Sequence, residues 1–135
     1  MASILIIDDY EPFRRSLRAL LQRAGHVVRE AHNGAEGIAS FLDQAPDLVI
    51  VDVFMPEKDG LETILDLRRI NPTVGVIAVS GESFADYYCF LGVAKHLGAT
   101  RVLPKPVQSA ELFRIIAELL APVAAEPSES SAAGQ

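Results

Sequence analysis

Short apolar runs alternate with amphipathic segments along most of this 135-residue chain. The apolar runs end in polar or turn residues, which is typical of strands in a buried sheet. They predict strands over Ser3 to Ile7, Val27 to Ala31, the run that ends at Asp52, Val74 to Val79, and Arg101 to Leu103. Between them, apolar residues recur at helical spacing and predict five helices: Pro12 to Ala24, a short one around Phe41, Leu61 to Ile70, Ser83 to Leu97, and Leu112 to Leu120. Five strand-helix repeats predict an α/β fold with a parallel sheet and helices on both faces.

In the central stretch from Asp47 to Gly60, DLVIVDVFMPEKDG, an apolar run leads into Asp52 and is followed by turn residues. This run indicates a strand buried on both faces, and Asp52 stands where that strand ends. Open α/β sheets bind ligands in the crevice outside the carboxyl ends of their strands. Asp52 is therefore a better functional candidate than a carboxylate in the middle of a helix.

Composition limits the classes of protein that fit. The chain has the length of one domain, which we place at residues 1–121. Residues 122–135, PVAAEPSESSAAGQ, contain almost no large apolar side chain and are predicted to be a disordered tail. A formal charge of −6 argues against a nucleic-acid surface, which would need clustered Lys and Arg.

Features at the N-terminus and at Cys89 predict a cytoplasmic protein. The N-terminal stretch MASILIIDD has no basic leader, and its apolar run is too short to cross a bilayer, so we expect no membrane insertion. Cys89 is the single cysteine, so no disulfide framework or thiolate metal cluster is expected.

Polar residues follow four of the predicted strands. Asp8 and Asp9 follow the first, Asp52 ends the third, Ser80 follows the fourth and Lys105 follows the fifth. If the first and third strands are neighbours, these side chains meet in one crevice. Clustered carboxylates repel one another unless a cation compensates them, and oxygen ligands favour Mg²⁺, with Mn²⁺ as an alternative.

This set of residues also suits phosphoryl transfer. An Asp carboxylate is an accepted nucleophile for that reaction, and a metal ion together with Lys105 would neutralise the charge of an aspartyl phosphate. Ser80 and nearby backbone N–H groups could donate hydrogen bonds to the phosphoryl oxygens.

At this point the chain resembles a known family, the receiver domain of bacterial two-component response regulators, from about Ile4 to Leu120. The resemblance rests on five motifs in the family's order: IIDD, DLVIVDVFMPEKDG, IAVSG, LGA and LPKP. It implies a flavodoxin-like, doubly wound sheet of strand order 2-1-3-4-5. It also implies a stand-alone response regulator whose donor is a histidine kinase or a histidine phosphotransfer protein, and which acts on a downstream protein not named by the sequence.

The resemblance further implies a role for each matching residue. Asp52 is the phosphoacceptor, Lys105 contacts the phosphoryl group, and Ser80 is the switch hydroxyl. The metal ligands implied are Asp8, Asp9, Asp52 and the carbonyl of Phe54. The peptide bond between Lys105 and Pro106 is expected to be cis, which proline permits.

Two departures from the family pattern affect the switch. Val102 stands three residues before Lys105, where the family usually has an aromatic residue. The segment between Ser80 and Lys105 is longer than usual and carries four aromatic residues: Phe84, Tyr87, Tyr88 and Phe90. We hypothesise that one of these aromatics takes over the switch role.

Two other functions compete with a phosphorylation switch as interpretations of these residues. Aspartyl-phosphate hydrolases pair the nucleophile with a second Asp two residues later, and this chain has Phe54 there, so the chain is expected to catalyse only its own phosphorylation and dephosphorylation. A phosphorylation-independent protein-binding module of receiver shape remains the alternative. Retention of the acidic residues and Lys105 argues against it.

Overall fold

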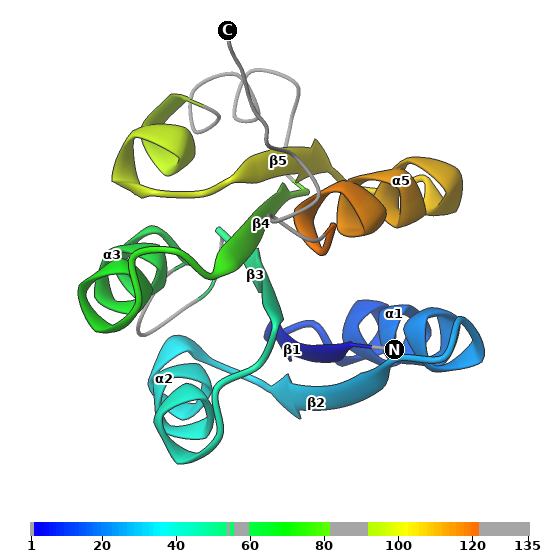
Figure 1. The fold of residues 1–135 in the computed structure, drawn as a ribbon, viewed down its shortest axis with the longest axis horizontal. Helices are drawn as coiled ribbons and strands as arrows, with labels where there is room; N and C mark the ends of the chain where they lie inside the picture. Colours follow the sequence, from blue (N-terminus) through cyan, green and yellow to red (C-terminus); the bar gives the residue numbers. More distant parts are fainter. Residues whose placement is uncertain (1, 54, 56–59, 82–91, 122–135) are drawn as a thin grey trace, which may run out of the picture.

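The five apolar runs form one parallel sheet in the strand order β2-β1-β3-β4-β5 (Figure 1). The structure is a computed structural model and describes residues 2–53, 55, 60–81 and 92–121. The strands are β1 (Ser3–Ile7), β2 (Val27–Ala31), β3 (Leu48–Asp52), β4 (Gly75–Ser80) and β5 (Arg101–Pro104). This confirms the α/β class and the predicted strand order. Because β3 is the central strand and is buried throughout, its last residue, Asp52, lies at the middle of the sheet's carboxyl end.

Helices cover both faces of this sheet (Figure 1). α1 (Glu11–Arg23) and α5 (Ser109–Leu119) lie on one face, and α2 (Gly34–Asp43) and α3 (Gly60–Ile70) lie on the other. Residues 92–97 are also helical and lie on the side of α2 and α3. The predicted start of that helix at Ser83, and the aromatics Phe84 to Phe90, lie outside the described residues.

Alternating side chains of the strands make two separate cores. In β1, Ile4 and Ile6 pack into the cluster that contains the apolar residues of α1 and α5. Leu5 and Ile7 pack into the cluster that contains those of α2 and α3. All four are fully buried. A strand covered on both faces therefore reads as an unbroken apolar run, because both of its side-chain rows are interior.

Several elements begin or end at residues other than those predicted from the sequence. β4 begins at Gly75 and ends at Ser80, one residue later than predicted at each end. β5 extends one residue further, to Pro104, which an edge strand tolerates. At the start of α2, Asn33 is the N-cap, and its side chain accepts a hydrogen bond from the Glu36 N–H.

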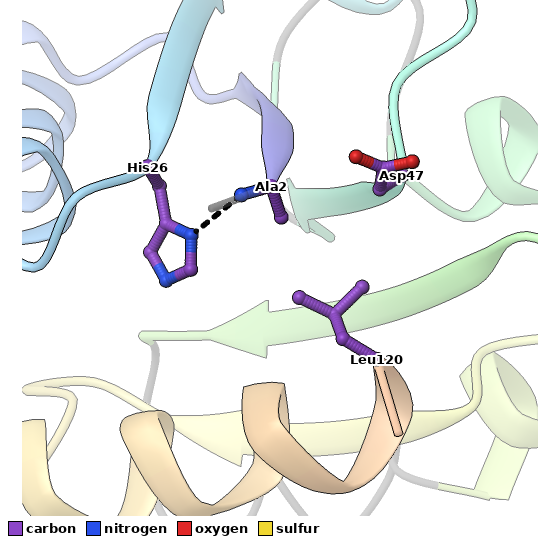
Figure 2. A pocket seen from close by; sticks show the side chains of 4 residues that line it. All are labelled: Ala2, His26, Asp47 and Leu120. Carbon is purple, nitrogen blue, oxygen red and sulfur yellow. Dashed lines mark hydrogen bonds between the residues drawn. The ribbon is translucent and has the colours of Figure 1, made fainter. Parts of the chain in front are cut away.

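The amino-terminal edge of the sheet carries a pocket of about 320 Å³ lined by Ala2, His26, Asp47 and Leu120 (Figure 2). The Ala2 N–H donates to His26 Nδ1 at 3.2 Å, and the Ser3 N–H donates to Asp47 Oδ2 at 2.8 Å. These bonds tie together the starts of neighbouring strands. The pocket thus lies at the opposite edge of the sheet from Asp8 and Asp52, which stand at the carboxyl ends of their strands.

Within the described part of the chain, none of the helices has the length and apolarity that crossing a membrane would require. The predicted tail, residues 122–135, lies outside the described residues, so its disorder stays a prediction.

Candidate functional site

The polar residues at the strand ends gather at the carboxyl edge of the sheet. Asp8 follows β1 directly and Asp52 ends β3, and these two strands are hydrogen-bonded neighbours. One carboxylate oxygen from each of Asp8, Asp9 and Asp52 lies within 4.8 Å of the other two. The strand order thus brings Asp52 next to the adjacent pair Asp8 and Asp9, which lies more than forty residues earlier in the sequence.

Two of these carboxylates are buried and share one cation. Asp8 is 2% exposed and Asp52 is 4% exposed, whereas Asp9 is exposed. Lys105 Nζ lies 3.0 Å from Asp8 Oδ2 and 3.5 Å from Asp52 Oδ2. A buried carboxylate is costly unless it is paired, and the ammonium group of Lys105 supplies a partner for both Asp8 and Asp52.

Packing around its side chain holds Lys105 in place. Its Nζ lies 4.3 Å from the centre of the Phe13 ring on α1, a cation–π contact. Its aliphatic stem lies against Gly81, where an added Cβ would come within 2.6 Å of Lys105 Cδ. The Lys105 N–H donates to the Ser80 carbonyl at 2.8 Å, and the Lys105–Pro106 peptide bond is cis, as the resemblance implied.

The hydroxyl of Ser80 stands at the carboxyl end of β4, between β3 and β5. Ser80 is 2% exposed, and its buried Oγ has no hydrogen-bond partner among the described residues. A buried polar group without a partner is uncommon and destabilising. The hydroxyl is therefore available to donate to a group that enters the site.

The donor set fits a hard divalent cation. Three carboxylates and one ammonium leave a formal charge of −2 when all are ionised, which one divalent ion would neutralise. Oxygen-only ligands select Mg²⁺ or Mn²⁺ over softer metals. Phe54, whose carbonyl the resemblance also assigned to the metal, lies outside the described residues.

The switch region is only partly described. Val102 in β5 is half-buried and packs against the core on the side of α2 and α3. The aromatic residues expected to take over the switch role in place of the family's usual aromatic at position 102, Tyr87 and Tyr88 among them, lie outside the described residues. The relocated switch therefore stays a prediction.

Gly60 allows α3 to pack closely against the end of β3, next to Asp52, which the sequence alone did not reveal. Gly60 is the buried first residue of α3, one residue before the predicted helix start at Leu61. A Cβ on Gly60 would come within 2.0 Å of the Asp52 carbonyl oxygen and 2.4 Å of Val53 Cα. Only a glycine lets α3 approach the end of β3 this closely.

An ion-pair cluster beside the site was also missed. Glu30 of β2 accepts hydrogen bonds from Arg14 at 2.6 Å and from Arg18 at 2.5 Å, both on α1. Arg14 also donates to the Asp8 carbonyl at 2.8 Å. A local signal was present: Glu30 lies two residues after the buried Val28 and therefore on the same face of β2, so a charged residue stands at an inward-facing position and needs a partner.

Glu30 is expected to stabilise the fold in a pH-dependent way. Burial raises the pKa of Glu30, but the hydrogen bonds and charges of Arg18 and Arg14 outweigh burial and hold its pKa below the ordinary value of 4.5. A depressed pKa contributes stability above the unfolded pKa that is lost as the pH falls. We expect Glu30→Gln to lower the free energy of unfolding by about 2 kcal/mol at pH 7, with a difference from the parent that shrinks below about pH 4.5.

Urea unfolding at several pH values measures this effect. Glu11→Gln is the matched control. Glu11 pairs with Arg15 on the exposed surface of α1, the helix that also carries Arg14 and Arg18, and such exposed pairs contribute about 0.5 kcal/mol or less. A Glu30→Gln deficit that stays constant from pH 7 to pH 3 would contradict the expectation.

The chain was compared with known proteins. The model of the response regulator receiver domain matches residues 4–117. Transcriptional regulatory protein CpxR of Klebsiella pneumoniae is 36% identical over 120 residues, which is 89% of this chain and 50% of the relative. Protein PilH of Pseudomonas aeruginosa is 34% identical over 123 residues, which is 90% of this chain and 99% of PilH. The chain thus spans about half the length of the CpxR relatives and nearly all of PilH.

Solved structures agree with this result. The chemotaxis protein CheY4 of Vibrio cholerae superposes with a TM-score of 0.79 at 28% identity, covering 89% of this chain and 99% of CheY4. A response regulator receiver domain protein from Clostridium thermocellum has a TM-score of 0.81 at 30% identity, covering 89% of this chain and 94% of that protein. Since the family model matches most of the chain and the fold is shared along nearly the whole of these relatives, the chain belongs to the response regulator receiver domain family.

Proposed function

We propose that the chain is a phosphorylation-driven switch in which Asp52 accepts a phosphoryl group from a phosphohistidine donor, a histidine kinase or a histidine phosphotransfer protein. The observation that carries the proposal is the pairing of Lys105 with two buried carboxylates next to a third. A receiver of this kind serves signalling, not turnover of a separate substrate. The modified protein then binds a downstream protein or passes the phosphoryl group on, and we place it in the cytoplasm.

The reaction is a direct displacement at phosphorus. A carboxylate oxygen of Asp52 forms the new O–P bond, the P–N bond to the donor histidine breaks, and its electron pair returns to the imidazole. The product is an acyl phosphate on Asp52 and a free histidine. Hydrolysis by water later restores the carboxylate and releases inorganic phosphate.

The residues around Asp52 would stabilise the charge that develops on the phosphoryl oxygens. Asp8, Asp9, Asp52 and the Phe54 carbonyl would hold Mg²⁺, or Mn²⁺ in its place, and the ion would neutralise phosphoryl charge when bound. Lys105 would turn from the Asp52 carboxylate to a phosphoryl oxygen within its reach. The Ser80 hydroxyl, which has no partner among the described residues, would donate to another phosphoryl oxygen.

This last contact explains how chemistry at Asp52 would reach a partner. A hydrogen bond from the Ser80 hydroxyl to the phosphoryl group would couple the end of β4 to the modification at Asp52. We expect this coupling to bias a two-state element, as covalent modifications commonly do.

The test is intact-mass analysis after incubation with Mg²⁺ and acetyl phosphate, and then with a phosphohistidine donor. We expect a single phosphoryl adduct that forms with Mg²⁺ and fails to form when the metal is chelated. Absence of an adduct with both kinds of donor would reject the proposal and favour the alternative, a phosphorylation-independent binding module.

A further inference from the structure

Each polar group of Asp8 has a bonding partner. Its N–H donates to the Ala31 carbonyl of β2 at 3.1 Å, and its carbonyl accepts from Arg14 Nη1 at 2.8 Å. Its Oδ1 accepts from the Tyr10 N–H at 2.8 Å, and its Oδ2 faces Lys105. The backbone of Asp8 is thus held from both sides, and the direction of its carboxylate depends on these contacts.

Arg14 is the side chain that binds the backbone carbonyl of Asp8. Its Nη1 binds Asp8 while its Nε binds Glu30 Oε1 at 2.6 Å, so one planar guanidinium bridges the turn after β1 and the strand β2. The side chains of Arg14 and Glu30 are only 13% and 17% exposed. Arg18 also binds Glu30, at 2.5 Å, but its side chain is 44% exposed and, among the described residues, forms no hydrogen bond or ion pair with Asp8.

We propose that Arg14 is a positioning residue for the metal site: anchored by Glu30, it holds the Asp8 carbonyl so that the Asp8 carboxylate keeps its place among the three metal-binding oxygens. This inference rests on the proposed function, because it concerns the same acidic cluster. Groups that orient metal ligands from behind commonly change metal affinity 10- to 100-fold when they are lost.

The fork geometry of Arg14 is what this role requires. A guanidinium presents several N–H donors in one rigid plane, so it can serve Asp8 and Glu30 at once. A lysine at position 14 would keep the positive charge but has a single flexible ammonium group. Arg14→Lys therefore separates positioning from electrostatics, since the net charge near the metal site does not change.

The experiment measures the affinity of the intact chain for Mg²⁺ by isothermal titration calorimetry, without phosphodonor, together with the melting temperature of each variant. Arg18→Lys is the matched control, because it alters the other arginine on Glu30. We expect Arg14→Lys to weaken Mg²⁺ binding about tenfold and Arg18→Lys to change it less than twofold. Glu30→Gln removes the carboxylate that anchors Arg14 but keeps Arg14 itself. We expect this variant, like Arg14→Lys, to bind Mg²⁺ more weakly than the parent.

The outcomes separate this inference from the proposed function. Equal Mg²⁺ affinity in the parent and Arg14→Lys would overturn the positioning role and leave the acidic cluster as the metal site. Equal weakening by Arg14→Lys and Arg18→Lys would also overturn it, because the effect would then follow general stability. A parent chain that does not bind Mg²⁺ would overturn both this inference and the proposed function.

Discussion

Asp52→Asn is expected to abolish the phosphoryl adduct, with both acetyl phosphate and a phosphohistidine donor. An amide oxygen is a poor nucleophile, and the amide carries no negative charge for the metal ion and Lys105 to balance. The side chain keeps its shape, and one of two buried carboxylates that share a single ammonium becomes neutral. We therefore expect the variant to stay folded, with a melting temperature within a few degrees of the parent.

Intact-mass analysis beside a thermal melt measures both parts of this prediction. Asp43→Asn is the matched control. Asp43 is exposed at the end of α2, away from the carboxyl ends of the strands, so this variant should form the adduct as the parent does. If Asp52→Asn still accepted one phosphoryl group at the parent's rate, another residue would be the acceptor and the assignment of Asp52 would be wrong.

Gly60→Ala is expected to cause the largest loss of stability among the variants considered, about 3 kcal/mol or more. The added methyl group would come within 2.0 Å of the Asp52 carbonyl oxygen and 2.4 Å of Val53 Cα. Both atoms belong to the backbone of the strand end, so neither can turn away as a flexible side chain would. Either α3 must move off the sheet or the end of β3 must shift.

Urea unfolding measures this loss. Gly92→Ala is the control, because Gly92 is also helical, yet a Cβ there meets nothing within 4 Å. Since alanine favours helix over glycine, that variant should be unchanged or up to about 1 kcal/mol more stable. Similar stabilities for Gly60→Ala and the parent would show that α3 does not rest on β3 as described.

The acidic cluster was predictable because the positions of its residues depend only on where the strands end and on the strand order. Asp8 and Asp52 each follow an apolar run directly, and parallel strands end at the same edge of a sheet. Once the first and third strands are neighbours, these carboxylates must meet. Lys105 was predictable for the same reason, since it follows the last strand.

The supporting contacts were harder to predict. The bond from Arg14 to Asp8 and the bonds to Glu30 depend on how α1 rotates and docks over β2, which helical periodicity does not specify to the nearest side chain. The role of Gly60 depends on the distance between α3 and β3. By contrast, the Asn33 cap was missed although Asn33 and Glu36 stand at capping-box spacing, a local signal that outweighs the turn preference of Asn-Gly.

The sequence by itself determined the class of fold, the alternation of elements and the set of residues at the carboxyl edge. These follow from local rules, because side-chain period, turn chemistry and strand ends are properties of short segments. Only the tertiary structure decided that one ammonium lies between Asp8 and Asp52, that the Ser80 hydroxyl lacks a partner among the described residues, and that Arg14 donates to the Asp8 carbonyl. These features depend on strand register and on how α1 docks on the sheet, which only the packed molecule specifies.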